Sequence, residues 1–337
     1  MPCSVISIGS GIRRNTSVCH PSGIITMDKL SNMNAFDFFF EHTTGLEKPF
    51  LVGKEEITYN DLYRSCISLS NWIRERVGTE KHLLLLSVNN LFFLKVYLAI
   101  IKSGNICIPL DPNIEKENFR YINDLTQPRL IFLTPDVEKR LELGSSSLKV
   151  LPGSEAFENI ALAEINTEKE FDRERCAEVI FTSGSTGKPK GVMISHKNLI
   201  ANTSSIVEYL QLTPDDCMMV VLPFYYCYGL SLLHTHLRVG GSIVFNNSFI
   251  FLGGVLKSLL DFKCTGFAGV PSHFQILLRK SDSFKQTRFP DLKYATQAGG
   301  KLAPIFIDEF REAHPDIRFV VMYGQTEATA RLSWLPP

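Results

Sequence analysis

Short apolar runs alternate with amphipathic segments along most of the chain, and this alternation constrains the fold more than any other feature. Residues 83–88 are almost entirely apolar, which is typical of a strand buried on both faces. Residues 92–103 follow with apolar side chains at helical spacing and stop at Gly104. Strands that alternate with helices form mostly parallel sheets covered by helices. The pattern therefore predicts an α/β protein with two helix-flanked, mostly parallel sheets.

The same reading assigns the remaining elements and a division of the 337 residues into two halves. Residues 1–26 lack periodicity and are expected to be a flexible leader, or sequence upstream of a start at Met27. Residues 141–178 are polar and weakly patterned, and are expected to link a first α/β subdomain (27–170) to a second one (171–337). Ser195 is a candidate N-cap. The other predicted strands are 106–109, 130–133, 179–181, 217–222, 242–245, 266–270, 294–297 and 318–322, and the other predicted helices are 61–73, 119–125, 197–210, 230–238, 272–279 and 303–312.

Composition excludes several classes of function. Hydrophobic residues make up 45% and charged residues 21%, which rules out global disorder. Thirty-five basic residues balance thirty-five acidic ones, whereas a protein that coats nucleic acid or an anionic membrane needs a basic excess. The eight cysteines form no Cys-x-x-Cys pair, so free thiols in a reducing cytoplasm are expected. Polar residues interrupt the most apolar stretch, 83–110, so no transmembrane segment is predicted.

Residues 179–191 carry the densest chemistry, with the sequence Val-Ile-Phe-Thr-Ser-Gly-Ser-Thr-Gly-Lys-Pro-Lys-Gly. Glycine lets the backbone approach an anion closely, hydroxyls donate to phosphate oxygens, and lysines supply positive charge. The spacing of the glycines is not that of a Walker P-loop. A flexible polar surface loop is the alternative. The predicted phosphate-binding residues are Thr182, Ser183, Gly184, Ser185, Thr186, Gly187, Lys188 and Lys190.

Residues 182–191 resemble the phosphate-binding loop of the adenylate-forming superfamily. This superfamily includes acyl-CoA synthetases, aryl-CoA ligases, firefly luciferase and nonribosomal peptide adenylation domains. The resemblance implies that the hydroxyls and Lys190 hold the β- and γ-phosphates of ATP. Thr186 and Lys190 would then act in catalysis.

A second stretch, Met-Tyr-Gly-Gln-Thr-Glu at 322–327, is similar to the adenylate-binding motif of the same superfamily. The resemblance implies that Tyr323 packs on adenine, that the Thr326 hydroxyl meets the α-phosphate and that Glu327 holds Mg²⁺. A hard carboxylate oxygen suits Mg²⁺, which otherwise relies on phosphate and water oxygens. Gly324 and Gln325 complete the predicted nucleotide contacts, and Thr326 and Glu327 join the predicted catalytic residues.

Three weaker matches imply an acid-binding site. Residues 223–229 resemble a loop that lines the acyl tunnel, with Tyr226 where many relatives carry His and where peptide-type domains carry Asp. The missing Asp argues against an α-amino acid substrate. Residues 297–302 resemble a Gly-rich turn beside adenine and the acyl carbonyl, and residues 269–272 resemble a wall of the site. Ordinary core aromatics and plain turns are the alternatives. The predicted acid-binding residues are Tyr226, Gly229, Val270, Ala298 and Gly299, and Gly299, Gly300 and Lys301 are predicted to border the nucleotide.

Four further residues receive a weaker prediction. His234 and His236 are expected to pack or to lie on the surface, because they are two apart on a predicted helix. His196 is expected to serve the start of a helix. Arg331 follows the adenylate motif and is predicted with equal weight to reach an anion or to lie on the surface.

The resemblance implies an AMP-forming ligase that activates a carboxylic acid with ATP and Mg²⁺ and passes the acyl group to coenzyme A or to a carrier-protein phosphopantetheine. Phe224, Tyr226 and Val270 favour a fatty or aryl acid. Relatives carry a catalytic Lys in a C-terminal domain that has no match here, so the chain is expected to be truncated and weakly active. A binding-only pseudoenzyme is the alternative. A homodimer is possible, and an acyl carrier protein is a candidate partner.

Overall fold

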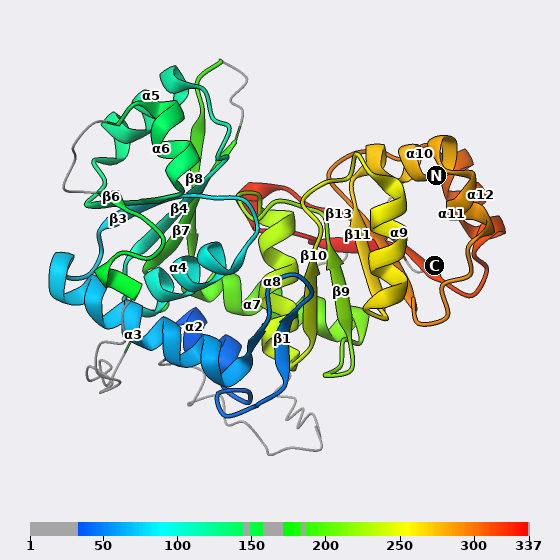
Figure 1. The fold of residues 1–337 in the computed structure, drawn as a ribbon, viewed down its shortest axis with the longest axis horizontal. Coiled ribbons are helices and arrows are strands. Elements are labelled where there is room, and N and C mark those ends of the chain that lie inside the picture. The colour runs from blue at the N-terminus through cyan, green and yellow to red at the C-terminus, as the bar shows by residue number, and fades with distance from the viewer. Residues whose placement is uncertain (1–32, 144–148, 158–170, 183–186, 336–337) are drawn as a thin grey trace, which may run out of the picture.

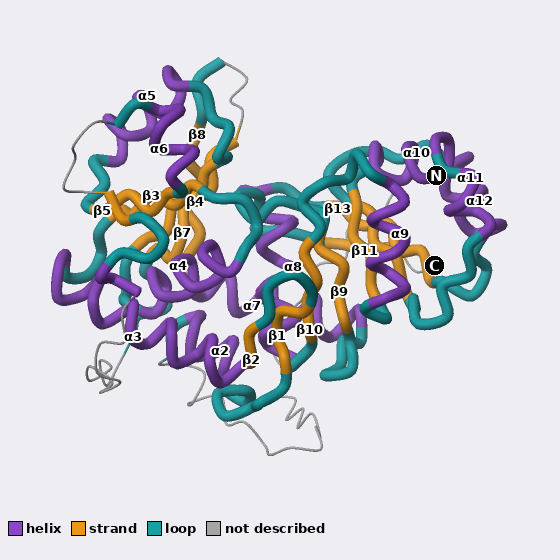
Figure 2. Tube along the Cα trace, in the orientation of Figure 1, coloured by secondary structure: helices purple, strands orange, loops and turns teal. Residues whose placement is uncertain are grey.

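The computed structural model describes residues 33–143, 149–157, 171–182 and 187–335. Helices and strands alternate as the pattern predicts, and two sheets result (Figures 1 and 2). The helices are α2 (Ala35–Phe40), α3 (Tyr59–Val77), α4 (Leu91–Lys102), α5 (Lys116–Thr126), α6 (Pro135–Leu141), α7 (His196–Leu210), α8 (Cys227–Val239), α9 (Leu252–Asp261), α10 (Pro271–Lys280), α11 (Asp282–Gln286) and α12 (Pro304–Ala313).

The strands form one six-stranded and one eight-stranded sheet among the described residues. The order in the first is β6-β5-β3-β4-β7-β8, with only β8 antiparallel to its neighbour. The order in the second is β14-β13-β12-β11-β9-β10-β1-β2, with β2 and β14 antiparallel at the two edges. The bounds are β1 (Pro49–Val52), β2 (Ile57–Thr58), β3 (His82–Leu86), β4 (Ile106–Leu110), β5 (Leu130–Leu133), β6 (Lys149–Val150), β7 (Cys176–Thr182), β8 (Lys190–Ser195), β9 (Cys217–Val220), β10 (Ser242–Phe245), β11 (Gly266–Gly269), β12 (Tyr294–Gln297), β13 (Arg318–Tyr323) and β14 (Ser333–Leu335).

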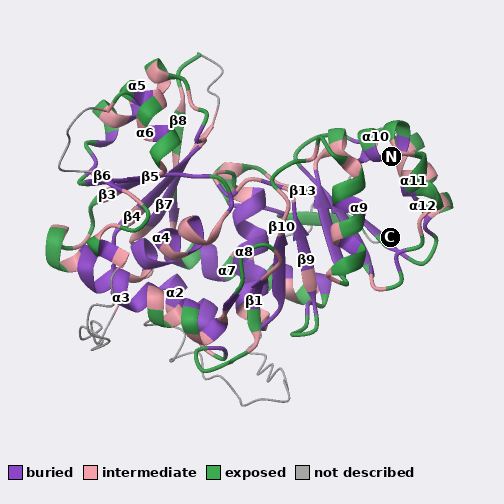
Figure 3. Cartoon of the chain, viewed as in Figure 1, coloured by how far each residue is buried: buried purple, intermediate pink, exposed green. Residues whose placement is uncertain are grey.

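The two sheets share a central layer of helices. Helices α2, α3, α4, α7 and α8 contribute to one apolar core that also takes side chains from both sheets. A second core joins the other face of the eight-stranded sheet to α9, α10 and α12, and a third joins the six-stranded sheet to α5 and α6 (Figure 3). The layers thus run helix, sheet, helix, sheet, helix, and the α/β prediction is confirmed.

Neither sheet is built from one half of the chain. Strands β7 and β8 lie after residue 171 but complete the six-stranded sheet, whereas β1 lies early and pairs with β10 in the eight-stranded sheet. The expected boundary near residue 170 therefore does not coincide with the division between the sheets. Residues 149–150, expected to belong to a linker, form the edge strand β6.

Local sequence explains where several elements begin and end. Ser195 caps α7 as predicted: its Oγ accepts from the Asn198 backbone N–H, and the Asn198 side chain accepts from the backbone N–H of Ser195. Helix α8 begins earlier than predicted and ends at Gly240, whose φ of +78° suits glycine. Helix α9 and strand β8 are not predicted, because Gly253 and Gly254 weaken one pattern and Lys190 and Gly191 weaken the other.

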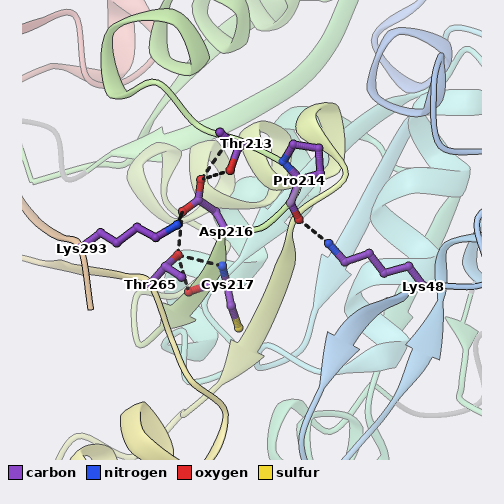
Figure 4. Close-up of polar contacts among 7 residues, drawn as sticks. All are labelled: Lys48, Thr213, Pro214, Asp216, Cys217, Thr265 and Lys293. Atoms are coloured by element: carbon purple, nitrogen blue, oxygen red, sulfur yellow. Dashed lines mark hydrogen bonds and ion pairs between the residues drawn. The ribbon is translucent and has the colours of Figure 1, made fainter. Parts of the chain in front are cut away.

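A polar cluster fixes the amino ends of two strands in the eight-stranded sheet (Figure 4). The buried Asp216 carboxylate accepts from the Thr213 backbone N–H at 2.7 Å and from the Thr265 hydroxyl at 2.7 Å. Lys293 adds an ion pair at 3.8 Å, and Lys48, directly before β1, donates to the Pro214 carbonyl. This cluster thereby links the amino ends of β9 and β11. Their carboxyl ends lie at the opposite edge of the sheet.

Candidate active site

Three of the predicted motifs follow three neighbouring strands. Val270 follows β11, Gly299 to Lys301 follow β12, and Tyr323 to Glu327 close or follow β13. These strands lie side by side and run parallel. Because the carboxyl ends of parallel strands meet at one edge, the motifs are brought together there, at the edge where open α/β sheets bind ligands. The fold thus joins segments that are far apart in the sequence.

The predicted phosphate loop lies at the turn of a hairpin. Strands β7 and β8 are antiparallel, and Thr182 pairs with Lys190 across the turn. Gly187 has a φ of +83°, and Lys188 and Lys190 are exposed. Ser183, Gly184, Ser185 and Thr186 lie outside the described residues. Strand β8 packs against the short 3₁₀ turn Thr326–Ala328, so the hairpin reaches the adenylate motif.

The adenylate motif leaves its predicted ligand groups accessible. The Tyr323 ring is 60% exposed at the end of β13 and offers a flat apolar face. Glu327 is exposed and has no hydrogen bond or ion pair among the described residues. In the described part of the chain, no group of three His, Cys, Asp or Glu side chains could hold a metal. One free carboxylate fits Mg²⁺ when phosphate and water oxygens supply the other ligands.

The acid-loop match places the start of α8 beside the adenylate motif. Cys227 Sγ lies 3.6 Å from Thr326 Oγ1. The Tyr228 hydroxyl bonds the Thr296 carbonyl at 3.1 Å, which ties α8 to β12. Tyr226 stands at the N-cap position without a side-chain capping bond and is 50% exposed. A Cβ on Gly229 would lie 2.1 Å from the Pro223 carbonyl oxygen, so only glycine fits where the loop folds over the helix.

The Gly-rich turn after β12 is compact. Ala298 is buried, whereas Gly299, Gly300 and Lys301 are exposed. The buried Gln297 side chain donates to the Gly300 carbonyl at 2.8 Å and so fixes the turn from within. Gly299 has a φ of +83°, and a Cβ there would lie 3.1 Å from Val270 Cγ1. The turn therefore needs glycine both for its backbone and for its approach to Val270.

Sequence reasoning missed one residue near this site, Asp111, and left the role of another, Arg331, undecided. Asp111, which follows β4, faces Tyr225 and Tyr226; burial first and Asp111 second raise the pKa of both phenols. Arg331, left open between anion and surface, is buried at 2% exposure and therefore is not a surface residue. Both placements depend on contacts between segments far apart in the sequence.

His196, His234 and His236 are buried and make contacts inside the protein. His196 begins α7 and accepts from the Ala35 backbone N–H at 3.1 Å. His234 stacks on Phe39 and lies 2.7 Å from the Tyr97 hydroxyl. His236 Nδ1 donates to the Leu232 carbonyl at 2.9 Å. Burial lowers the pKa of His196 and His234 to about 3 and that of His236 to about 4, so all three are neutral at pH 7. The expectation of packing roles agrees with these contacts.

Residues 40–337 match the family of AMP-binding enzymes, which is most of the chain. The chain belongs to this family. The superfamily suggested by the motifs is thereby confirmed.

Relatives in the family are adenylate-forming ligases. The chain is 28% identical to the D-alanine–D-alanyl carrier protein ligase of Streptococcus pneumoniae, over 83% of this chain and 54% of the relative. It is 26% identical to 4-coumarate–CoA ligase-like 9 of Arabidopsis thaliana, over 82% of this chain and 51% of the relative. It is also 26% identical to tyrocidine synthase 3 of Brevibacillus parabrevis, over 84% of this chain and 4% of the relative. The chain therefore spans about half the length of the two single ligases.

Solved structures show the same fold. The anthranilate CoA ligase AuaEII, in complex with anthranoyl-AMP, superposes with a TM-score of 0.83 at 19% identity, over 91% of this chain and 62% of the other. VinN in complex with L-aspartate superposes with a TM-score of 0.80 at 23% identity, over 91% and 79%. In the described part of this chain, no helix is long and apolar enough to cross a membrane.

Proposed function

We propose that the chain is the nucleotide- and acid-binding region of an AMP-forming ligase. A carboxylate oxygen of the acid attacks the α-phosphorus of ATP, the bond from that phosphorus to the β-phosphate bridging oxygen breaks, and pyrophosphate leaves. A thiol of coenzyme A or of a carrier protein then attacks the acyl carbonyl and releases AMP. The meeting of the acid loop and the adenylate motif, at the 3.6 Å contact between Cys227 and Thr326, supports this most strongly.

The proposed roles follow the chemistry of the side chains. Lys188, Lys190 and the hydroxyls of the loop 182–186 neutralise and orient the β- and γ-phosphates, and Thr326 donates to the α-phosphate. Tyr323 covers adenine, while Gly299 to Lys301 border the base and the acyl group. Bound Mg²⁺ would supply charge neutralisation at the phosphates, with Glu327 as its protein ligand. Catalysis is then mostly positioning and electrostatics.

The choice of a fatty or aryl acid, the acceptor thiol, a cytoplasmic location and a homodimer stay predictions. The name of the 4-coumarate–CoA ligase-like relative supports an aryl acid, whereas the D-alanine–D-alanyl carrier protein ligase is named for an amino acid. Tyr226 in place of an acidic residue weighs against an amino group. The binding-only alternative holds nucleotide or acyl-adenylate without turnover.

ATP–pyrophosphate exchange with a panel of carboxylic acids tests the ligase against the binding-only alternative. We expect acid-dependent exchange that is weak in residues 1–337 and stronger in any longer natural form of the protein. Nucleotide binding without exchange in either form would favour the binding-only function. Absence of both would reject an adenylate-forming site.

Glu327→Ala tests the metal role within that site. Because a ligand bond from a charged group contributes about 1.5–3 kcal/mol, Mg²⁺-dependent ATP binding should weaken by about 10- to 100-fold. Titration calorimetry with and without Mg²⁺ measures this, with Glu312→Ala on the exposed face of α12 as the matched control. Equal Mg²⁺ dependence in Glu327→Ala and wild type would remove Glu327 from the site.

A further inference from the structure

Two cysteines that are distant in the sequence meet at the amino ends of neighbouring strands. Cys217 is the first residue of β9, and Cys264 lies two residues before β11. The two segments are bonded through their backbones, since the Thr265 N–H donates to the Cys217 carbonyl at 2.8 Å and the Cys217 N–H donates to the Thr265 hydroxyl at 2.9 Å (Figure 4). Both cysteine side chains pack against the apolar core beneath α9. The fold therefore places them on the same face of the sheet.

The two thiol groups are in direct contact. The Cys264 thiol is placed to donate either to the Cys217 sulfur or to the Ser258 carbonyl oxygen, which lies 3.8 Å from Cys264 Sγ. Cys264 is buried at 1% exposure, whereas Cys217 is only half-buried. One sulfur of the pair can thus be reached from solvent, and the other is enclosed.

The surroundings of the pair make Cys217 the easier thiol to ionise. The hydrogen bond from Cys264 lowers the pKa of the Cys217 thiol, and the Lys48 ammonium lowers it further. Burial and the Asp216 carboxylate act in the opposite direction. Lys48 is held in place because it donates to the Gly240 carbonyl at 2.8 Å. The contact with Cys217 and burial raise the pKa of Cys264, so Cys264 stays protonated while Cys217 forms the thiolate.

The other cysteines in the described part of the chain have the opposite electrostatic setting. Burial raises the pKa of Cys66, Cys107 and Cys227, and it raises that of Cys176 to about 11. Oxidants react with the thiolate rather than the thiol, and they need access to it. Among the described cysteines, reactivity toward an oxidant is therefore concentrated at Cys217.

We propose that Cys217 and Cys264 are a peroxide-sensitive thiol pair that closes to a disulfide. The Cys217 thiolate, whose proton has passed to solvent, attacks one oxygen of hydrogen peroxide; the O–O bond breaks, and Cys217 sulfenic acid and hydroxide form. The Cys264 sulfur then attacks the sulfenic sulfur, the S–O bond breaks, and the Cys264 proton leaves with the hydroxyl group as water. The two thiols lose two electrons in total, and the peroxide is reduced to two waters.

The bond would cross-link the sheet at the edge opposite the proposed ligase site. The inference therefore does not depend on the ligase function. The chain between the two cysteines carries α8, β10 and α9, so the disulfide would close a long loop. A disulfide restricts the unfolded chain more when the loop that it closes is longer. The oxidised protein should therefore be more stable than the reduced one.

Peptide mapping after peroxide treatment tests the proposal directly. All proteins carry Cys3→Ser and Cys19→Ser, so that only the six described cysteines remain. The full chain is treated with an equimolar amount of hydrogen peroxide, its free thiols are alkylated, and its peptides are compared with and without reductant. We expect the main cross-link to join Cys217 to Cys264. The half-buried Cys176→Ser is the matched control and should keep this cross-link.

Single variants test the order of the two steps. In Cys264→Ser the second thiol is missing, so the Cys217 sulfenic acid should persist and be trapped by dimedone. In Cys217→Ser, Cys264 should give no dimedone adduct, because its thiol is buried and protonated. A dimedone adduct on Cys264 and none on Cys217 would overturn the assignment. Where a serine variant does not fold, the alanine variant takes its place.

Thermal unfolding shows whether the bond fits the native fold. Oxidation should raise the Tm by about 3–8 °C, and it should leave the Tm of Cys264→Ser without such a rise. The proposal is overturned if peroxide leaves both residues as thiols, or if the main cross-link joins other cysteines. A bond between Cys217 and Cys264 that lowers the Tm would also overturn it, because the fold would then be distorted to bring the sulfurs together.

Discussion

Glu178 is a carboxyl group buried on β7, the strand that leads to the predicted phosphate loop. Its Oε2 lies 2.7 Å from the Tyr97 hydroxyl, which also lies 2.7 Å from Nε2 of His234. Burial raises the pKa of Glu178 to about 7, although the Tyr97 hydrogen bond opposes the change. The Tyr97 hydroxyl donates its one proton to Glu178, so its oxygen accepts from Nε2–H of neutral His234. The three side chains thus form one buried hydrogen-bonded chain.

Glu178→Gln should reduce the loss of stability with rising pH. The folded-state pKa of about 7 exceeds the ordinary 4.5, so the stabilisation is complete below pH 4.5 and is lost as the pH rises through 7. Urea unfolding at pH 5 and pH 8 should show wild type losing about 2–3 kcal/mol more than Glu178→Gln. The exposed Glu208→Gln should behave as wild type. Equal losses in Glu178→Gln and wild type would contradict the buried titration.

Single residues were predictable where a motif named them and not where distant segments meet. Thr326 and Glu327 stand out in the sequence because their spacing is diagnostic. Arg331 does not, because its burial depends on contacts from α7 and α8 that no local pattern encodes. Asp111 is similar: only the fold brings it to Tyr226. The sequence does not show which charged side chains are buried away from solvent. Buried charged residues are therefore identified only in the structure.

Among the elements, α8 does the most to assemble the proposed site. It begins inside the acid loop, touches Thr326 through Cys227 and holds Arg331 through the Ser231 carbonyl. Gly229 lies in its first turn, pressed against the Pro223 carbonyl. The path of the loop and the start of the helix therefore require glycine, which has no side chain, at position 229.

Gly229→Ala should destabilise the protein, against the usual trend in helices. Alanine in place of helical glycine normally stabilises by about 0.5–1 kcal/mol. Here the added Cβ would meet backbone at 2.1 Å, and we expect a loss of at least about 2 kcal/mol. Gly254→Ala on α9 is the matched control, since nothing lies within 4 Å of its Cβ and it should stabilise. Denaturant unfolding measures both, and a stabilised Gly229→Ala would show that the loop relaxes freely.

The elements were predicted best where they are buried on all sides. Strands β5, β10 and β12 match their predicted ranges residue for residue, because both faces of these strands are covered. Strand β8 was not predicted, because it is an edge strand in which Lys190 and Met193 are exposed. Helix α3 runs past its predicted end to Val77 because the charged residues of its last turns face solvent. The positions of edge strands and of helix ends therefore depend on contacts with neighbouring elements as much as on their own residues.

At the scale of the whole molecule, the two sheets exchange strands between the halves of the chain. Residues 27–170 lack β7 and β8, and residues 171–337 lack β1 and β2. Each half alone would expose the side chains of the shared central core. Neither half has the complete set of strands that its sheet needs.

Expressed separately, residues 27–170 and 171–337 should not fold. Circular dichroism during heating should show no cooperative transition for either fragment, whereas the full chain should unfold cooperatively. Mixing the fragments should restore part of the transition, because the missing strands are then supplied. A cooperative transition in one isolated half would show that it is an independent folding unit.

During synthesis, β1 can pair with β10 only after β10 has emerged from the ribosome. Leu51 leaves the ribosome long before its partner Ile243, and the edge of β1 that pairs with β10 stays unpaired in that interval. At ~5–20 residues per second the wait is roughly 10–40 s, far longer than a hairpin needs to form. An apolar edge such as Phe50 and Leu51 is then open to a wrong strand or to another nascent chain. The first strand of the described structure therefore depends on a partner strand, β10, that is synthesised much later in the chain.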